Sequence, residues 1–414
     1  MRALWTDDII KKILDHLSDD TKSLAACSLV STKWAPASRA VLFHDYHLHV
    51  TRHNAYDFVL HILPYQGSRW SLFPHIRYLT LDDEAPTSGW RPSIYSMIPR
   101  GLSLANGKTI DVTFKHVECS QSCSATRLAF YPMNQQPLTS LSLHSVAFLL
   151  AEDLLTMITA FNALEHLELG AIEFLDSDSK LVFRLKAPRN LRSLTVSGPF
   201  TDGRSGAAVA GIWPWLLGDQ PPLIISTLRL NHIDKFTAKI LLAGLKPSLN
   251  RLEISHSDAM VDLFLAYGCV DILQDHKYLR RLHFYNASIT EQSRSLLSFF
   301  PSTHLTTISI SHRARFFAGS SGTSIDFLVQ AIQLYARRFP ALEEIHVTPY
   351  LGPRDSFSAR DELNIRGRFS QMLMITQNAN LCITPQQLSR DQLSRIPPLP
   401  FAIKDKAGMW HDVE

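Results

Sequence analysis

The sequence contains few cysteines and no long apolar run. Only five of its 414 residues are cysteine, an odd number that is too small for a disulfide framework, so we expect a reducing compartment. No apolar stretch approaches the roughly 20 residues that a membrane-spanning helix needs. Asp7 and Asp8 interrupt the place where a secretory signal would have its apolar segment. We therefore expect a soluble protein of the cytoplasm, the nucleus or both, with no membrane partner.

The chain also has no block of charges of one sign. Its 41 Lys and Arg residues and 38 Asp and Glu residues are interspersed, and the formal net charge is only +3. This balance does not favour non-specific binding to nucleic acid, and we expect no nucleic-acid partner. A hydrophobic content of 45% excludes wholesale disorder, so most of the chain must fold.

Motifs of catalytic and metal-binding sites are missing or incomplete. Two clusters contain residues that bind metals, namely His44, His47, His49 and His53, and His116 with Cys119 and Cys123. The first has only Asp45 to complete a tetrahedral set and is interpreted as a solvated linker, while the second lacks a second Cys pair and is interpreted as a polar loop. The glycines between 198 and 211 lack the spacing of a phosphate-binding loop. We predict no catalytic residue, no cofactor, no metal site and no enzymatic activity.

The first 45 residues predict three short helices with more apolar surface than so small a unit can bury. Thr6 or Asp7 can cap the first helix, and the turn of residues 18–20 can cap the second. Ser31 and Thr32 then start the third. About forty residues is near the size at which a domain needs outside help to stay folded. The surplus indicates either docking onto a partner or packing of these helices onto the rest of the chain as a cap.

The stretch from Trp5 to about Phe43 resembles an F-box, the helical motif by which substrate receptors of cullin-based ubiquitin ligases bind their adaptor. The resemblance depends on the acidic-aliphatic start, on Ile13, Leu14 and Leu17, and on the pattern that runs from Leu24 through Cys27 to Trp34. The family usually begins with Leu-Pro, where this chain has Trp5 and Thr6. The resemblance implies a Skp-family adaptor as partner, contacted by Ile9, Ile10, Ile13, Leu14, Leu17, Leu29, Val30 and Trp34.

The rest of the chain contains a repeat with the frame L-x-x-L-x-L. Ten copies begin at Ile76, Ile110 (a degenerate copy), Leu138, Leu164, Leu191, Ile225, Leu249, Leu279, Leu305 and Leu342. From Leu138 onward they start 24 to 37 residues apart, close to the period of leucine-rich repeats but with insertions. Helix-compatible stretches separate them, for example residues 151–158, 236–245, 290–300 and 324–339. The consensus places Asn or Cys at the ninth position, whereas this chain has residues such as Val146 and Ile172, so we expect apolar packing to hold the turns.

The sequence therefore predicts an α/β fold. A three-helix F-box-like unit precedes an irregular leucine-rich-repeat solenoid, with parallel strands on the concave side and helices on the convex side. A doubly wound sheet also alternates strands and helices and remains the structural alternative. The expected domains are the helical unit at 1–45, a linker at 46–70, the solenoid at 71–350, and a cap helix with a Pro-containing tail at 351–414.

The resemblance to F-box proteins with leucine-rich repeats implies a non-catalytic substrate-recognition subunit of a Skp-cullin-F-box E3 ubiquitin ligase. The alternative is a leucine-rich-repeat interaction scaffold that is not linked to ubiquitination. A target protein of unknown identity would contact the variable position between the two strand leucines of each repeat. These positions are Ser142, Glu168, Thr195, Arg229, Glu253, His283, Ser309 and His346.

Overall fold

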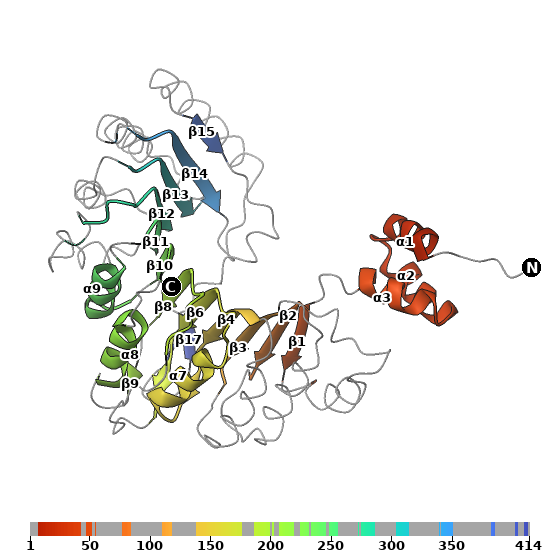
Figure 1. Cartoon of the computed structure of the whole chain (residues 1–414), viewed down its shortest axis with the longest axis horizontal. Coiled ribbons are helices and arrows are strands. Elements are labelled where there is room, and N and C mark those ends of the chain that lie inside the picture. Colours follow the sequence, from red (N-terminus) through yellow and green to blue (C-terminus); the bar gives the residue numbers. More distant parts are fainter. Residues whose placement is uncertain are drawn as a thin grey trace, which may run out of the picture. The chain divides into compact units, whose positions relative to one another are not determined.

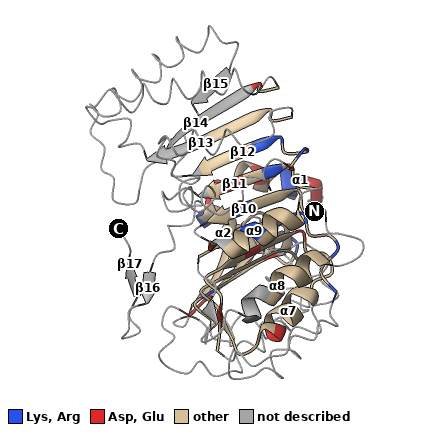
Figure 2. Ribbon diagram, turned by 90° about the vertical axis from the view of Figure 1, so that its left-hand side faces the viewer, with Lys and Arg blue, Asp and Glu red and all other residues tan. Residues whose placement is uncertain are grey.

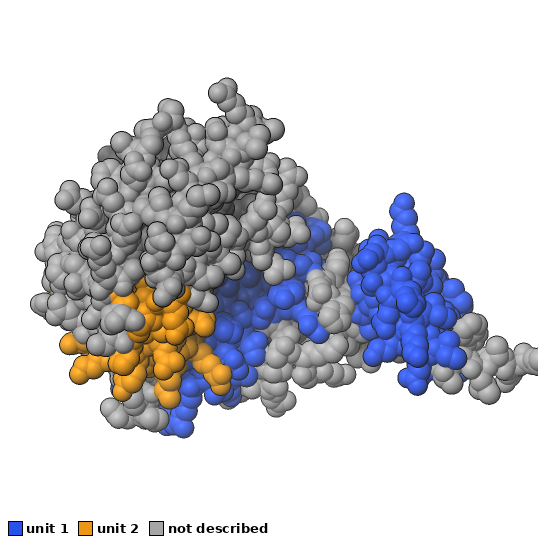
Figure 3. Space-filling view, turned by 90° about the horizontal axis from the view of Figure 1, so that it is seen from above, with its two compact units in different colours: residues 1–191, 200–220 blue, residues 192–199, 221–414 orange. Residues whose placement is uncertain are grey.

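The computed structural model of the chain has a long parallel sheet and three helices at its N-terminus, which makes it an α/β protein (Figure 1). The chain divides into two compact units (Figure 3). Unit 1 comprises residues 1–191 and 200–220, and unit 2 comprises residues 192–199 and 221–414. The structure describes residues 7–42, 47–51, 54, 77–83, 110–117, 138–175, 186–198, 201–202, 207–218, 224–231, 233–245, 248–255, 272, 275–285, 304–313, 339, 341–350, 382–385, 402–404 and 410–412.

Three helices form the N-terminal part of unit 1, as the sequence predicted. They are α1 (Asp7–His16), α2 (Thr21–Val30) and α3 (Trp34–Leu42). The carboxylate of Asp20 caps α2 by accepting hydrogen bonds from the backbone N–H groups of Lys22 and Ser23, both at 3.1 Å. Ile10, Leu14 and Leu24 form a small core, which is flanked by Leu17, Cys27, Trp34, Ala37, Val41 and Leu42. The three N-terminal helices thus have a small apolar core of their own.

Five parallel strands form the sheet of unit 1, in the order β1-β2-β3-β4-β6. They are β1 (His47–Thr51), β2 (Tyr78–Asp82), β3 (Ile110–Lys115), β4 (Leu138–His144) and β6 (His166–Gly170). Helix α7 (Ala151–Thr159) connects β4 to β6 and contacts α8 (Ala207–Gly218). The strands follow one another in chain order, so each new strand is added at the same edge of the sheet.

Unit 2 contains seven parallel strands in the order β8-β10-β11-β12-β13-β14-β15. They are β8 (Ser193–Ser197), β10 (Thr227–Asn231), β11 (Arg251–Ser255), β12 (Arg281–Tyr285), β13 (Thr307–Arg313), β14 (Glu344–Tyr350) and β15 (Cys382–Pro385). Helix α9 (Lys235–Gly244) lies between β10 and β11 in the chain. A separate antiparallel pair, β16 (Ala402–Lys404) and β17 (Trp410–Asp412), ends the described chain.

The register of the strands confirms the predicted repeat frame. Leu79 pairs with Val112, which pairs with Leu141, and Leu141 pairs with Leu167. In unit 2 the same position runs through Leu194, Leu228, Leu252, Leu282, Ile308 and Ile345. The leucines of these strands are buried almost completely, because alternate side chains of a strand point to one face of the sheet. The L-x-L spacing therefore places one apolar row after another in the core.

Two strands lie in ranges where no repeat was expected. β1 falls within the range 46–70 that was interpreted as a linker, and it pairs with β2 through Leu48 and Val50. β15 falls within the range expected to hold the cap helix and tail, and it pairs with β14. The predicted helix at 290–300 and the cap helix, predicted at 358–374 within the range 351–414, lie outside the described residues. Of the helix predicted at 324–339, only Phe339 is described. The predicted helices at 151–158 and 236–245 correspond to α7 and α9.

A left-handed residue follows each of the strands β3, β4, β6 and β8. His116, Ser145, Ala171 and Gly198 each have a positive φ, between 50° and 76°, and each stands directly after its strand. A short strand begins two residues after Ser145 and Ala171 and three residues after Gly198. These strands are β5 (Ala147–Phe148), β7 (Glu173–Phe174) and β9 (Thr201–Asp202), and they form a three-stranded parallel sheet. The residue between, such as Val146 or Ile172, is buried.

This small sheet explains how the turns hold together without a polar side-chain ladder. The N–H of Ala147 donates to the carbonyl of Val117 at 2.9 Å, and the N–H of Glu173 donates to the carbonyl of Val146 at 3.0 Å. The backbone groups thereby satisfy one another from repeat to repeat, while the ninth-position side chains supply apolar packing. The expectation of apolar packing at Val146 and Ile172 is confirmed.

Candidate functional site

From Ala25 onward, the outer face of α2 is apolar although it is exposed to solvent. Leu29 is 82% exposed and Val30 is 69% exposed, and they are the two most exposed large apolar side chains of α1, α2 and α3 within the described ranges. Ala25 and Ala26 are exposed as well and share their face of the helix, because residues at i, i+1, i+4 and i+5 lie on one side of an α-helix. Leu24 and Cys27 occupy the opposite face and pack into the core. α2 is therefore apolar on both faces.

The structure divides the eight predicted adaptor contacts into three sets: two buried, three exposed and three half-buried. Ile10 and Leu14 are 1% and 0% exposed and belong to the core, so they hold the helices together, and any contact of theirs with an adaptor stays a prediction. Ile9, Leu29 and Val30 are exposed. Ile13, Leu17 and Trp34 are half-buried, and Leu17 and Trp34 pack against the core. Trp5 and Thr6, which replace the Leu-Pro of the family, lie outside the described residues.

The predicted target-contacting residues occupy one register position of the strands, which we call the middle row. Ser142 pairs with Glu168 in unit 1. In unit 2 the middle row runs through Thr195, Arg229, Glu253, His283, Ser309 and His346 on successive strands. Ser142, Glu168, Thr195, His283 and Ser309 have half-buried side chains, and that of His346 lies outside the description. The repeat frame thus aligns these positions, while their role in binding stays a prediction.

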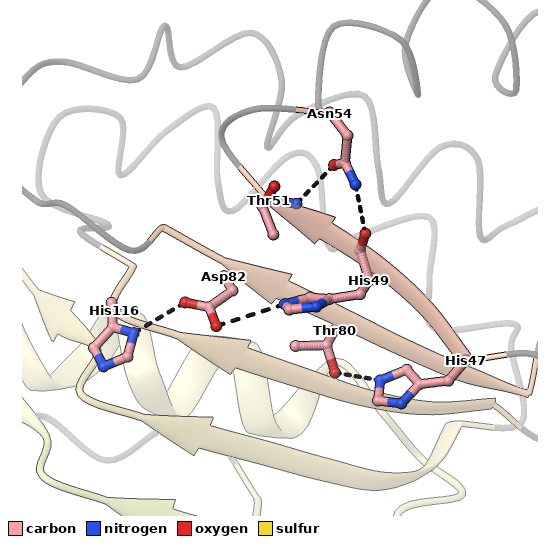
Figure 4. A network of polar contacts seen from close by, with 7 residues as sticks. All are labelled: His47, His49, Thr51, Asn54, Thr80, Asp82 and His116. Atoms are coloured by element: carbon pink, nitrogen blue, oxygen red, sulfur yellow. Dashed lines mark hydrogen bonds and ion pairs between the residues drawn. The ribbon is translucent and has the colours of Figure 1, made fainter.

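A network of imidazoles and one carboxylate connects the first three strands of unit 1 (Figure 4). Asp82, at the end of β2, lies between His49 of β1 and His116 after β3. Its Oδ2 is 3.5 Å from Nε2 of His49, and its Oδ1 is 2.9 Å from Nδ1 of His116. A second pair of this kind joins His144 of β4 to Glu168 of β6 at 3.6 Å, and the hydroxyl of Ser142 donates to the same carboxylate.

His47, also on β1, lies beside this network (Figure 4). Its Nε2 is 2.6 Å from the hydroxyl of Thr80, and its ring lies 6.1 Å from that of Tyr78. Burial lowers the pKa of His47, and the positive charges of His49 and Lys115 lower this pKa further. Burial also raises the pKa of the Asp111 carboxyl on β3, against the opposing effects of His166 and a hydrogen bond with Thr139.

The arrangement around Asp82 differs from that of a metal centre. The two imidazoles approach the carboxylate from opposite sides, so that it bridges them and no common point is left for an ion (Figure 4). Over the ranges that the structure describes, no group of three or more His, Cys, Asp and Glu side chains could hold a metal ion. Four members of the clusters considered from sequence, His44, His53, Cys119 and Cys123, lie outside those ranges. What the network can do is fasten β1 to the strands beside it.

The polar face of unit 2 has a different charge. Glu253 on β11 is almost buried and lies between two guanidinium groups, with Arg251 at hydrogen-bond distance and Arg229 at 3.8 Å. The carboxylate of Glu253 therefore forms ion pairs with two arginines. The middle-row residues alone have mixed charges and do not distinguish unit 2 from unit 1. Aligning the first residue of each strand as well as the middle one would have revealed the difference.

Comparison of the chain with known protein families and with curated proteins yields no match. In the helices that the structure describes, none combines the length and the apolar character that crossing a membrane requires.

Proposed function

We propose that this protein is a non-catalytic substrate-recognition subunit of a Skp-cullin-F-box E3 ubiquitin ligase of the cytoplasm, the nucleus or both. The N-terminal helices bind a Skp-family adaptor, and through it a cullin scaffold that carries the ubiquitin-transferring machinery. The repeats hold a target protein near that machinery, so that its lysines reach a high local concentration. The resemblance of residues 5–43 to an F-box supplies the identity of the adaptor.

The exposed apolar face of α2 is the observation that carries this proposal. Leu29 and Val30 remain in solvent even though the three helices already have a core. A contiguous apolar face on a helix that is already packed favours a protein partner. In the F-box proteins that this stretch resembles, the partner of these helices is the adaptor. Ile9 on α1 is the further exposed apolar residue of the predicted set.

We further propose that the repeats form a leucine-rich-repeat solenoid. A doubly wound sheet reverses its strand order at a switch point, whereas the strands of each unit follow chain order without reversal in the part of the chain that the structure describes. The polar middle row also favours a sheet with helices on one face only, because a sheet covered on both faces has apolar strands throughout. The open polar face would then be the surface that receives the target.

Affinity purification after proteasome inhibition tests the proposal. The full chain should recover a Skp-family adaptor, a cullin and ubiquitinated target proteins, whereas a chain that lacks residues 1–45 should lose the adaptor and cullin and retain the targets. If the full chain recovers target proteins but no adaptor, the result would instead favour the alternative, a repeat scaffold that is not linked to ubiquitination. A control F-box protein purified in parallel shows that the adaptor is available for capture.

A further inference from the structure

The strands of unit 2 begin at an edge that is rich in arginine. We define the starting edge as the first residue of each strand together with the residue before it. From β8 to β13 this edge contains Arg192, Arg251, Arg280 and Arg281 and no carboxylate. The residues that precede the strands belong to the same hydrogen-bonded edge, since the N–H of Arg280 donates to the carbonyl of Asn250 at 2.8 Å. Figure 2 shows the basic residues in blue at the start of β12.

Most of this positive charge is not neutralised by the residues that the structure describes. Arg251 pairs with Glu253, whose carboxylate also faces Arg229, so the one acid on this part of the sheet is already shared. Arg192, Arg280 and Arg281 are exposed, and none of them forms an ion pair with a residue that the structure describes. The turn that leads into β12 contains Asp275 and Lys277, whose charges offset each other.

The arginine-rich part of the starting edge ends before β14, where two carboxylates stand at the start of the strand. Glu343 and Glu344 take the places there that the arginines take at β12. Parallel strands are about 4.8 Å apart, so the distance from the start of β8 to the start of β12 is about 14 Å, and an extended peptide with about 3.3 Å per residue crosses it in four or five residues. The cationic stretch thus fits a short acidic segment in both charge and length.

We propose that the starting edge of β8–β12 binds an acidic segment of the target protein, about five residues long, with Arg280 and Arg281 as its main contacts. Arginine suits this task because its guanidinium donates two parallel hydrogen bonds to one carboxylate. A nucleic acid fits less well. Proteins that bind duplexes typically neutralise six to ten phosphates, whereas this edge offers four arginines and ends at two glutamates. The inference rests on target binding by the repeats and is independent of adaptor binding.

Fluorescence anisotropy with the full chain and a labelled ten-residue peptide of alternating Asp and Glu tests this inference. The wild-type protein should bind the peptide in 50 mM salt and bind it more weakly in 300 mM salt, because screening weakens exposed ion pairs. Arg281→Glu should weaken binding at least about tenfold, since charge-assisted hydrogen bonds are lost and repulsion is added. Lys239→Glu, which makes the same change of charge on the exposed side of α9, should change binding less than twofold.

Three results would overturn the inference: no binding of the peptide to the wild-type chain, equal losses in Arg281→Glu and Lys239→Glu, or tighter binding of a ten-nucleotide single-stranded DNA that also depends on Arg281. The milder variant Arg280→Gln, checked by circular dichroism, guards against a folding defect and should weaken binding severalfold. Adaptor binding is measured on the same preparations. If adaptor binding is retained while the peptide does not bind, this inference fails and the proposed function stands. If the wild type does not bind the adaptor, the proposed function fails independently of the peptide result.

Discussion

Replacing Leu29 and Val30 together by Ser should abolish most adaptor binding and leave the chain folded. Burying an aliphatic side chain of this size contributes about 1.5–3 kcal/mol, and both side chains are largely exposed in the free protein. Covering the exposed parts of both would contribute about 3 kcal/mol to binding, which corresponds to a change in Kd of about 100-fold. The free energy of unfolding should change by less than about 0.5 kcal/mol per substitution, as is usual on surfaces.

Biolayer interferometry against an immobilised Skp-family adaptor gives the affinities, and urea unfolding followed by circular dichroism gives the stabilities. The matched control replaces Lys11 and Lys12 by Ser, because these residues are also exposed but lie on the polar side of α1. It should bind as the wild type does. If the Leu29 and Val30 variant binds within twofold of the wild type while folded, α2 is not the docking face and the argument from its exposure is refuted.

Three further predictions concern the stability of the fold. Leu14→Ala should destabilise the N-terminal helices by about 2–5 kcal/mol, because Leu14 is fully buried, and thermal unfolding followed by circular dichroism would show it; an unchanged transition would contradict the assigned core. Gly198→Ala should cost about 1–2 kcal/mol in urea unfolding, since alanine must take up the positive φ of 76°, and no loss would contradict that conformation. The folded pKa of His47 is lowered, so the unfolded chain takes up its proton first and stability should fall as pH drops through about 6.5. His47→Gln should reduce this fall, and equal pH profiles of the two proteins would exclude His47 as its cause.

The repeat frame could be predicted from the sequence because its physical signal is strong. Leucines three and then two residues apart recur with polar residues between them, and each copy makes the same strand. β1 was missed because Asp45 stands where the frame has its leading leucine, so that Leu48 and Val50 alone remained in a histidine-rich stretch. The left-handed residues after the strands have no common side chain, since His116, Ser145 and Ala171 share only their position.

The division of the N-terminal helices into core and surface could not be predicted for a related reason. Apolar residues recur at helical spacing on both faces of α2. The periodicity of the sequence therefore does not predict which face packs into the core. Only packing against α1 and α3 places Leu24 inside and Leu29 outside. The same holds for the network around Asp82, whose partners are separated by more than thirty residues in the chain and meet only through the register of the strands.

Isothermal titration calorimetry of the full chain with a purified Skp-family adaptor tests the central claim most directly. The account predicts one-to-one binding with a negative change in heat capacity, which is the mark of apolar surface leaving water. Titrations at three temperatures measure that change. Absence of binding at every temperature, with an adaptor preparation that binds a control F-box protein under the same conditions, would contradict the account.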